Sequence, residues 1–267
     1  MSKYVPMLAA LAIILPGVFS SPTGMAVPQD DWCRDGGDRN RGWACEVREM
    51  TLSTMNPVRV DAGPNGGISV VGWDRNEIRL EARVQAQAQT DAEAEALVKD
   101  VEVLTGSTGI RSEGPATQRR ESWSVSFRLS VPRNSNLNLE TLNGGIAIEG
   151  VSGRIEFETT NGGVRLADLG GDVSGRTSNG GVRVTLTGTE WQGGQLDVVT
   201  TNGGVRLVVP EGYNARLETG TTNGGMSIDF PITVQGRIGR HLSTDLGRGG
   251  SLIRVRTTNG GVTITRG

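Results

Sequence analysis

The three-residue sequence Asn-Gly-Gly occurs seven times in this chain and constrains its fold more than any other feature. The triplets begin at Asn65, Asn143, Asn161, Asn179, Asn202, Asn223 and Asn259. The last six share one pattern and are spaced 18, 18, 23, 21 and 36 residues apart. A repeat of this length indicates a stack of similar units, in which each unit buries its apolar side against its neighbours.

Apolar and polar residues alternate on both sides of these six triplets. Leu, Ile or Val stands six residues before each Asn, and Val, Ile, Leu or Met stands three and five residues after it. The residue two positions before is always threonine: Thr141, Thr159, Thr177, Thr200, Thr221 and Thr257. A period of two with many β-branched residues is typical of strands that bury one face.

Each triplet is expected to turn the chain, because glycine tolerates positive φ and asparagine visits the left-handed region more readily than most residues. Two architectures fit: an antiparallel series of hairpins, or coils stacked with the triplets in one column. We favour stacked coils, because like Thr and Asn side chains would then form ladders at about 4.8 Å spacing. Residues 232–252 are expected to form an irregular coil that fills the longest interval and turns at Gly247–Gly250.

The fold predicted is all-β: a β-solenoid of Asn-Gly-Gly repeats over residues 134–267, with a small β-rich cap over 51–133. In the cap we expect strands near 58–60, 68–70, 78–84 and 123–131, and a loop over 106–118. One helix is expected over 91–101, because Thr90 can cap it and Glu93 can complete a capping box.

The first 50 residues indicate export. Lys3, an apolar run over residues 5–15 and small residues up to Ala26 resemble a secretory signal over 1–26, with an uncleaved anchor as the alternative. The segment 27–50 carries both cysteines, Cys33 and Cys45. An even cysteine count in an exported chain indicates a disulfide, whereas a metal site is a weaker alternative because the one histidine, His241, is remote.

The charge pattern suggests one candidate binding site. Arg165, Arg183 and Arg206 all stand four residues after an Asn of the repeat, so a stack of coils would place them in an outward ladder. Arginine binds planar anions in a two-pronged geometry, which suits acidic glycans or phosphate-rich polymers. Neutralisation by nearby acids is the alternative. The net charge of −2 gives no basic field for nucleic acid.

Two sets of residues in the sequence are of the types found in catalytic sites. His241, Ser243 and Asp245 are the residue types of a hydrolytic triad, and Glu156, Asp197 and Glu218 share one repeat column, as paired carboxylates of a glycosidase would. We interpret both sets as surface residues and predict no catalytic residue, metal or cofactor. The tryptophans are interpreted as packing residues rather than sugar platforms, and Trp191, in the longest of the regular repeats, is the best candidate for an exception.

These residues also resemble a known family. The Thr-Asn-Gly-Gly-Val repeats, Val131-Pro132-Arg133, Gly72-Trp73-Asp74 and the sequence from Cys45 to Glu49 are similar to the bacterial DUF4097 family of putative adhesins. The resemblance covers roughly residues 45–267. It implies an exported β-strand repeat domain of solenoid shape, with some relatives linked to envelope stress systems, and it implies no catalytic residues.

The function predicted is that of a secreted or periplasmic, non-enzymatic structural or adhesion-like protein, whose repetitive surface makes multivalent contacts. A polysaccharide-active β-helix enzyme and a partner or sensor in envelope stress signalling are the alternatives. The expected partner is a cell-surface glycan or an envelope protein, without nucleic acid and without a transmembrane span in the mature chain. End-to-end self-association is also expected, because the sequence stops just past the last coil.

Overall fold

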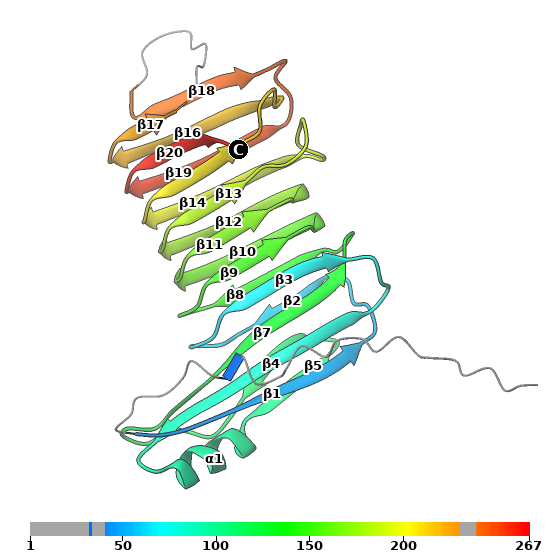
Figure 1. Cartoon of the computed structure of the whole chain (residues 1–267), viewed down its shortest axis with the longest axis vertical. Coiled ribbons are helices and arrows are strands. Elements are labelled where there is room, and N and C mark those ends of the chain that lie inside the picture. Colours follow the sequence, from blue (N-terminus) through cyan, green and yellow to red (C-terminus); the bar gives the residue numbers. More distant parts are fainter. Residues whose placement is uncertain (1–31, 34–40, 230–238) are drawn as a thin grey trace, which may run out of the picture.

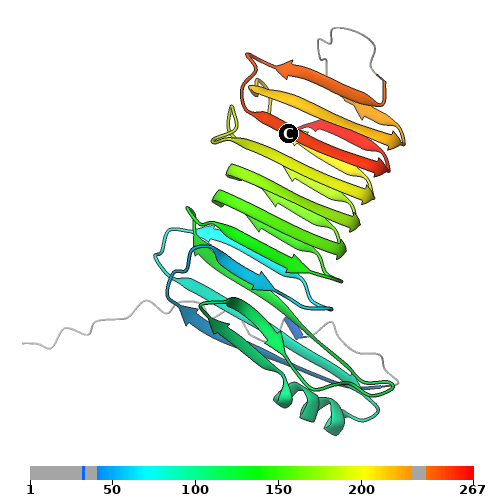
Figure 2. The same cartoon turned by 180° about the vertical axis from the view of Figure 1, so that it is seen from behind.

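The computed structural model describes residues 32–33, 41–229 and 239–267 (Figure 1). The signal segment expected over 1–26 and part of the stretch 232–252 lie outside these ranges. Two sheets of ten strands each face one another across an apolar core (Figures 1 and 2). The predicted all-β class, with one helix among the described residues, is confirmed.

The elements follow one another along the chain as β1 (Gly42–Leu52), β2 (Val58–Asp61), β3 (Ile68–Trp73), β4 (Ile78–Ala88), α1 (Asp91–Asp100), β5 (Glu102–Gly106), β6 (Gly109–Glu113), β7 (Ser122–Pro132), β8 (Leu137–Thr141), β9 (Ile146–Glu149), β10 (Ser152–Asn161), β11 (Val164–Ala167), β12 (Gly170–Asn179), β13 (Val182–Thr185), β14 (Gln195–Asn202), β15 (Val205–Val209), β16 (Ala215–Asn223), β17 (Met226–Ile228), β18 (His241–Leu246), β19 (Leu252–Asn259) and β20 (Val262–Arg266). Sheet A has the order β1-β4-β7-β3-β9-β11-β13-β15-β20-β17, and sheet B has the order β18-β16-β19-β14-β12-β10-β8-β2-β6-β5.

Each Asn-Gly-Gly triplet carries the chain from a strand of sheet B to a strand of sheet A. Strands of successive coils pair in parallel and in register, so that Thr159 lies opposite Thr177 in sheet B and Val164 lies opposite Val182 in sheet A. Hairpins would pair antiparallel. The hairpin alternative is therefore excluded for the repeat strands.

Asparagine and threonine side chains join the coils at these corners. The asparagine amides form one ladder, in which Asn161 donates to Asn143 at 2.7 Å and Asn179 donates to Asn161 at 2.8 Å. The threonine hydroxyls donate to the first glycine carbonyl of the preceding coil, as from Thr159 to Gly144 at 2.8 Å. The expected ladders are present, and the threonines are almost completely buried.

The first glycine of each triplet is required for a reason that differs from the one expected. Gly144, Gly162 and Gly180 are not among the glycines with positive φ. A Cβ at Gly162 would instead lie 1.9 Å from the Gly144 carbonyl oxygen, and one at Gly180 would lie 2.0 Å from that of Gly162. The coils thus approach so closely here that no side chain fits between them.

The triplet at Asn65 belongs to the same stack. Asn65 pairs with Asn143, β2 pairs with β8 and β3 pairs with β9, all in parallel. Between Val60 and Asn65 the chain has one residue more than the corresponding stretch from Leu139 to Asn143. This extra residue hides the coil from a sequence alignment, and the parallel stack extends back from residue 134 to Val58.

The last coil in the sequence is not the last in space. β19 lies between β14 and β16, and β20 lies between β15 and β17, so the coil coloured red in Figure 1 is inserted between two earlier coils. The expectation that residues 232–252 fill a place in the stack as an irregular coil is wrong. The described part of that stretch forms β18, which pairs antiparallel with β16 at the edge of sheet B.

The N-terminal part extends both sheets. β1, β4 and β7 pair antiparallel and continue sheet A, and α1 packs against β1 and β4. The predicted capping box is present, with Thr90 and Glu93 bonded to each other's backbone. The predicted loop over 106–118 is wrong in part, because β6 forms there and pairs with β2 and β5. The predicted disulfide joins Cys33 and Cys45.

The threonine column provides a matched test of the corner contacts. Thr159→Val removes the donor to Gly144, so the unfolding free energy should fall by about 1–3 kcal/mol in a urea titration. Thr221 is equally buried, but its hydroxyl has no partner among the described residues. Thr221→Val should therefore be neutral or stabilising, and an equal loss in both variants would contradict this account of the corners.

Candidate binding groove

One row of outward-facing residues crosses sheet A, with one residue from each strand. From β7 to β15 the row runs Arg128, Ser69, Ala147, Arg165, Arg183 and Arg206. Neighbouring strands are about 4.8 Å apart. The structure thus places the three predicted arginines on adjacent strands and adds Arg128 from β7. We call Arg128, Arg165, Arg183 and Arg206 the basic row, and all four side chains are exposed.

Within the described ranges the three repeat arginines have no charged partner. Arg165, Arg183 and Arg206 make no ion pair and no side-chain hydrogen bond with any residue in the ranges that the structure describes. On sheet B, by contrast, Arg176 contacts Glu158 at 2.7 Å, and this hydrogen bond and charge raise the pKa of the Arg176 guanidinium. The alternative expectation of neutralisation by nearby acids thus finds no ion pair to support it.

The basic row lines a groove of about 760 Å³ on the outer face of sheet A. Beside the row the groove is lined by the second glycines of the triplets, which are Gly67, Gly145, Gly163, Gly181 and Gly204. A Cβ at Gly163 would lie 3.5 Å from the nearest atom, an ordinary contact, unlike the clash at Gly162. The floor of the groove is therefore bare backbone, at positions where coil packing restricts side chains much less.

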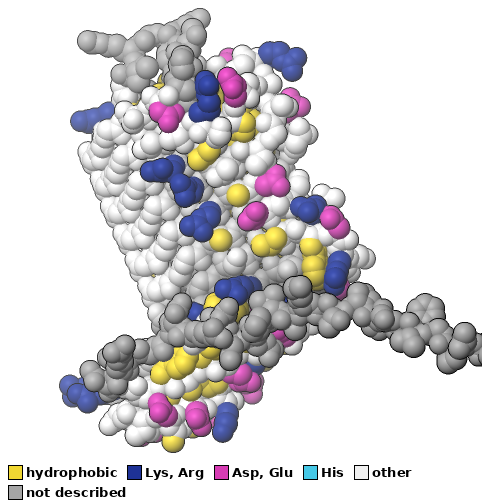
Figure 3. All heavy atoms as spheres, viewed as in Figure 1, with side chains coloured by type: hydrophobic (Ala, Val, Ile, Leu, Met, Phe, Trp, Pro, Cys, Tyr) yellow, Lys and Arg dark blue, Asp and Glu magenta, His cyan; other side chains and the backbone are white. Residues whose placement is uncertain are grey.

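Basic side chains predominate along this outer face of sheet A. In Figure 3 the edge formed by the turns of the middle coils shows no charged side chains, and basic side chains lie just beside it. In the next row on sheet A, two residues further along each strand, Glu149 is the one acidic residue between β7 and β15. The groove is thus predominantly positive.

Trp32 forms the end of the groove beside β7. The Arg128 guanidinium lies 3.7 Å from the centroid of the Trp32 ring, and that of Arg83 lies 5.4 Å from it. Arg83 also donates to the Trp32 carbonyl at 2.9 Å. Burial, and then the charge of Arg128, lower the pKa of Arg83. The disulfide at the next residue, Cys33, fixes this tryptophan to β1.

Sequence reasoning missed Arg128 and Trp32 as members of this site. The alternation of Val125, Phe127 and Leu129 does mark Arg128 as outward-facing, but only the pairing of β7 with β3 aligns it with the repeat arginines. Nothing in the sequence connects Trp32 with either arginine.

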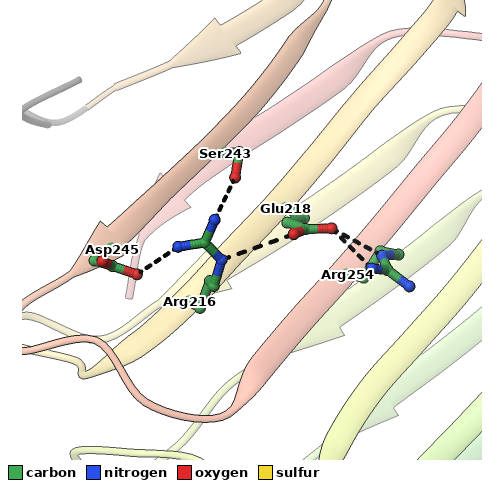
Figure 4. A network of polar contacts seen from close by, with 5 residues as sticks. All are labelled: Arg216, Glu218, Ser243, Asp245 and Arg254. Carbon is green, nitrogen blue, oxygen red and sulfur yellow. Dashed lines mark hydrogen bonds and ion pairs between the residues drawn. The ribbon is translucent and has the colours of Figure 1, made fainter. Parts of the chain in front are cut away.

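The column of carboxylates does not form a catalytic pair. Arg254 from the inserted coil stands between Asp197 and Glu218. It donates to Asp197 at 3.2 Å and to Glu218 at 2.9 Å, and Figure 4 shows the contact with Glu218. The hydrogen bonds that Arg254 donates to Glu218 and then to Asp197 raise the pKa of its guanidinium. Glu156 is separated from Asp197 by Ser174 and pairs with Arg154 at 2.9 Å.

This cluster instead favours the observed order of the coils. If β14 and β16 were neighbours, Asp197 and Glu218 would face each other as like charges, which destabilises a strand pair. Insertion of β19 places the positive charge of Arg254 between them.

His241, Ser243 and Asp245 do not form a triad. They lie on the exposed face of β18 in the order of the sequence, with Ser243 between the other two, whereas a triad needs the histidine between serine and aspartate. Arg216 donates to Ser243 at 3.3 Å and to Asp245 at 3.4 Å (Figure 4). These contacts tie β18 to β16.

Trp191 is a packing residue. Its side chain is 6% exposed, and its indole N–H donates to the Gly171 carbonyl at 2.9 Å. The exception considered at this position, an exposed sugar platform, is wrong. No group of three or more His, Cys, Asp or Glu residues in the described ranges is arranged to hold a metal ion.

These features define the class of the molecule: an all-β protein of parallel coils with a basic groove on one outer face. The chain belongs to the Toastrack DUF4097 family, whose model matches residues 65–265. No curated protein sequence matches the chain. No helix in the described ranges has the length and apolar character needed to span a membrane.

Several solved structures are similar to this chain at low identity. A putative cell adhesion protein from Clostridium sporogenes ATCC 15579 shares 8% identity at a TM-score of 0.42, over 83% of this chain and 100% of the other. A putative adhesin from Bacteroides fragilis NCTC 9343 shares 10% identity at a TM-score of 0.43, over 83% of this chain and 97% of the other. A putative lipid binding protein from Parabacteroides distasonis ATCC 8503 shares 8% identity at a TM-score of 0.27, over 84% of this chain and 96% of the other.

The adjacent like charges of Arg165, Arg183 and Arg206 should carry a measurable stability cost. Like charges on adjacent strands repel, so Arg183→Gln should raise the unfolding free energy by about 0.5 kcal/mol at low ionic strength. Added salt should remove the gain by screening. Arg176→Gln is the control, because it removes an ion pair and should not stabilise. Thermal unfolding at two salt concentrations measures both variants, and no gain for Arg183→Gln would contradict the repulsion.

Proposed function

We propose that this protein is an exported, non-enzymatic β-solenoid of the bacterial cell envelope, with β1, β4, α1 and β5 to β7 as a cap at one end of the stack. The observation that carries this proposal is the register of the coils. Because the strands pair in register, the same outward residue type recurs on successive strands, as the arginines do at Arg165, Arg183 and Arg206. Repeated weak contacts on one rigid surface add up to strong attachment.

The disulfide supports a location outside the cytoplasm. Disulfides persist in oxidising compartments such as the periplasm and the extracellular space, and Cys33 and Cys45 are joined. Removal of residues 1–26 during export remains a prediction. The partner proposed is a cell-surface glycan or an envelope protein, rather than nucleic acid.

Two alternatives are weaker. A polysaccharide-cutting enzyme would need a pair of free carboxylates, one of them an acid with a raised pKa, whereas Asp197 and Glu218 both hold Arg254. A role as a partner or sensor in envelope stress signalling rests on the family resemblance alone. End-to-end self-association remains a proposal. An open end at the last coil of the sequence does not support it, because that coil lies inside the stack.

The proposal is tested by producing the full chain in a bacterium, crosslinking whole cells and separating the cell fractions. We expect the chain outside the cytoplasm, shortened at its N-terminus and crosslinked to an envelope polymer or protein. The lengths of envelope polysaccharides incubated with the purified chain should not change. A cytoplasmic location with reduced cysteines would contradict the export, and shortened polysaccharides would favour the enzyme.

A further inference from the structure

We propose that the groove beside the basic row binds an acidic polysaccharide that lies along the stack, across the strands of sheet A. The inference rests on the proposed function and names the ligand class for it. It assigns the groove lined by Arg165, Arg183 and Arg206 as the binding site, with Arg128 and Trp32 at its end.

The basic row runs along the stack, across the strands, and this sets the direction of the proposed ligand. The groove residues come from six neighbouring strands, β7, β3, β9, β11, β13 and β15, so the groove spans roughly 24 Å along the stack at the usual strand spacing. A polymer in this direction meets an arginine on each of three successive coils. A peptide that added a strand to a sheet edge would run at right angles to this direction.

The charge spacing favours sugar residues. Arg165, Arg183 and Arg206 lie on adjacent strands about 4.8 Å apart, which is close to the length that one sugar residue adds to an extended chain. A polymer with a carboxylate on each residue therefore matches one charge to each coil. The planar guanidinium can hold a carboxylate by two parallel hydrogen bonds, and none of the three is engaged by another group in the described part of the chain.

The shape of the groove favours a ligand with bulky rings. Gly145, Gly163, Gly181 and Gly204 leave the floor without side chains. The backbone beneath is already bonded between coils, as from the Val164 N–H to the Gly181 carbonyl at 2.9 Å, so the floor adds no strong charge of its own. Specificity would come from the arginines on one side and the Trp32 ring at the end.

Binding of the purified, disulfide-bonded chain to immobilised polygalacturonate tests this site, with neutral dextran and polyphosphate as comparison surfaces. The triple variant R165Q/R183Q/R206Q should bind polygalacturonate about tenfold more weakly or worse, because three modest charge contacts are lost together. The control R59Q/R119Q/R256Q removes three exposed arginines outside the groove and should bind like the wild type. Equal losses in both variants would overturn the site in favour of net charge alone.

A second pair of variants tests the groove without changing charge. Gly163→Gln and Gly204→Gln place a neutral side chain on the groove floor, where a Cβ makes only ordinary contacts, and each should weaken binding several-fold. Gly225→Gln is the control, because its Cβ meets nothing and it does not line the groove. Unfolding curves of all variants confirm that they fold. Unchanged binding by both floor variants would overturn the proposal.

The comparison surfaces decide the ligand class. Binding to polygalacturonate but not to dextran supports the proposal, whereas binding to polyphosphate alone would overturn the choice of a glycan. If the chain crosslinks to envelopes in cells but binds no polygalacturonate, this inference fails while the proposed function stands.

Discussion

The architecture depends on one close backbone contact, repeated at every corner of the stack. The first glycine of each triplet lies so near the carbonyl of the neighbouring coil that a Cβ would sit about 2 Å from its oxygen, as at Gly162 and Gly144. The same carbonyl accepts the hydroxyl proton of a buried threonine, as from Thr159. Together these contacts fix the distance and the register between coils, because a shift of one residue would lose the threonine bond and create a clash.

The outer surface follows from this register. Side chains at equivalent positions are held at the strand spacing, so a residue type that recurs in the repeat becomes a row. The asparagine row forms a hydrogen-bonded ladder. The row of Arg165, Arg183 and Arg206 has no partner among the residues that the structure describes. The second glycine is less restricted than the first and leaves a bare floor beside these arginines. One triplet thus serves the coil contact and the groove.

The sequence predicted the features that depend on local or repeated patterns. These include the parallel strands around the last six triplets, the helix with its capping box at Thr90 and Glu93, and the arginine column. Long-range pairing was not predictable. Each coil offers nearly the same edge, so the place of the coil at Asn259 depends on contacts between distant residues, such as that of Arg254 with Asp197 and Glu218. The strand β6 and the position of Trp32 likewise depend on distant partners.

The most direct measurement compares the unfolding free energies of Gly162→Ala and Gly163→Ala, two neighbouring substitutions that add the same methyl group. If the first glycine sets the coil spacing, Gly162→Ala should lose at least about 3 kcal/mol or fail to fold, because its Cβ would overlap the Gly144 carbonyl. Gly163→Ala should remain within about 1 kcal/mol of the wild type. Equal effects of the two substitutions would contradict the central role of this contact.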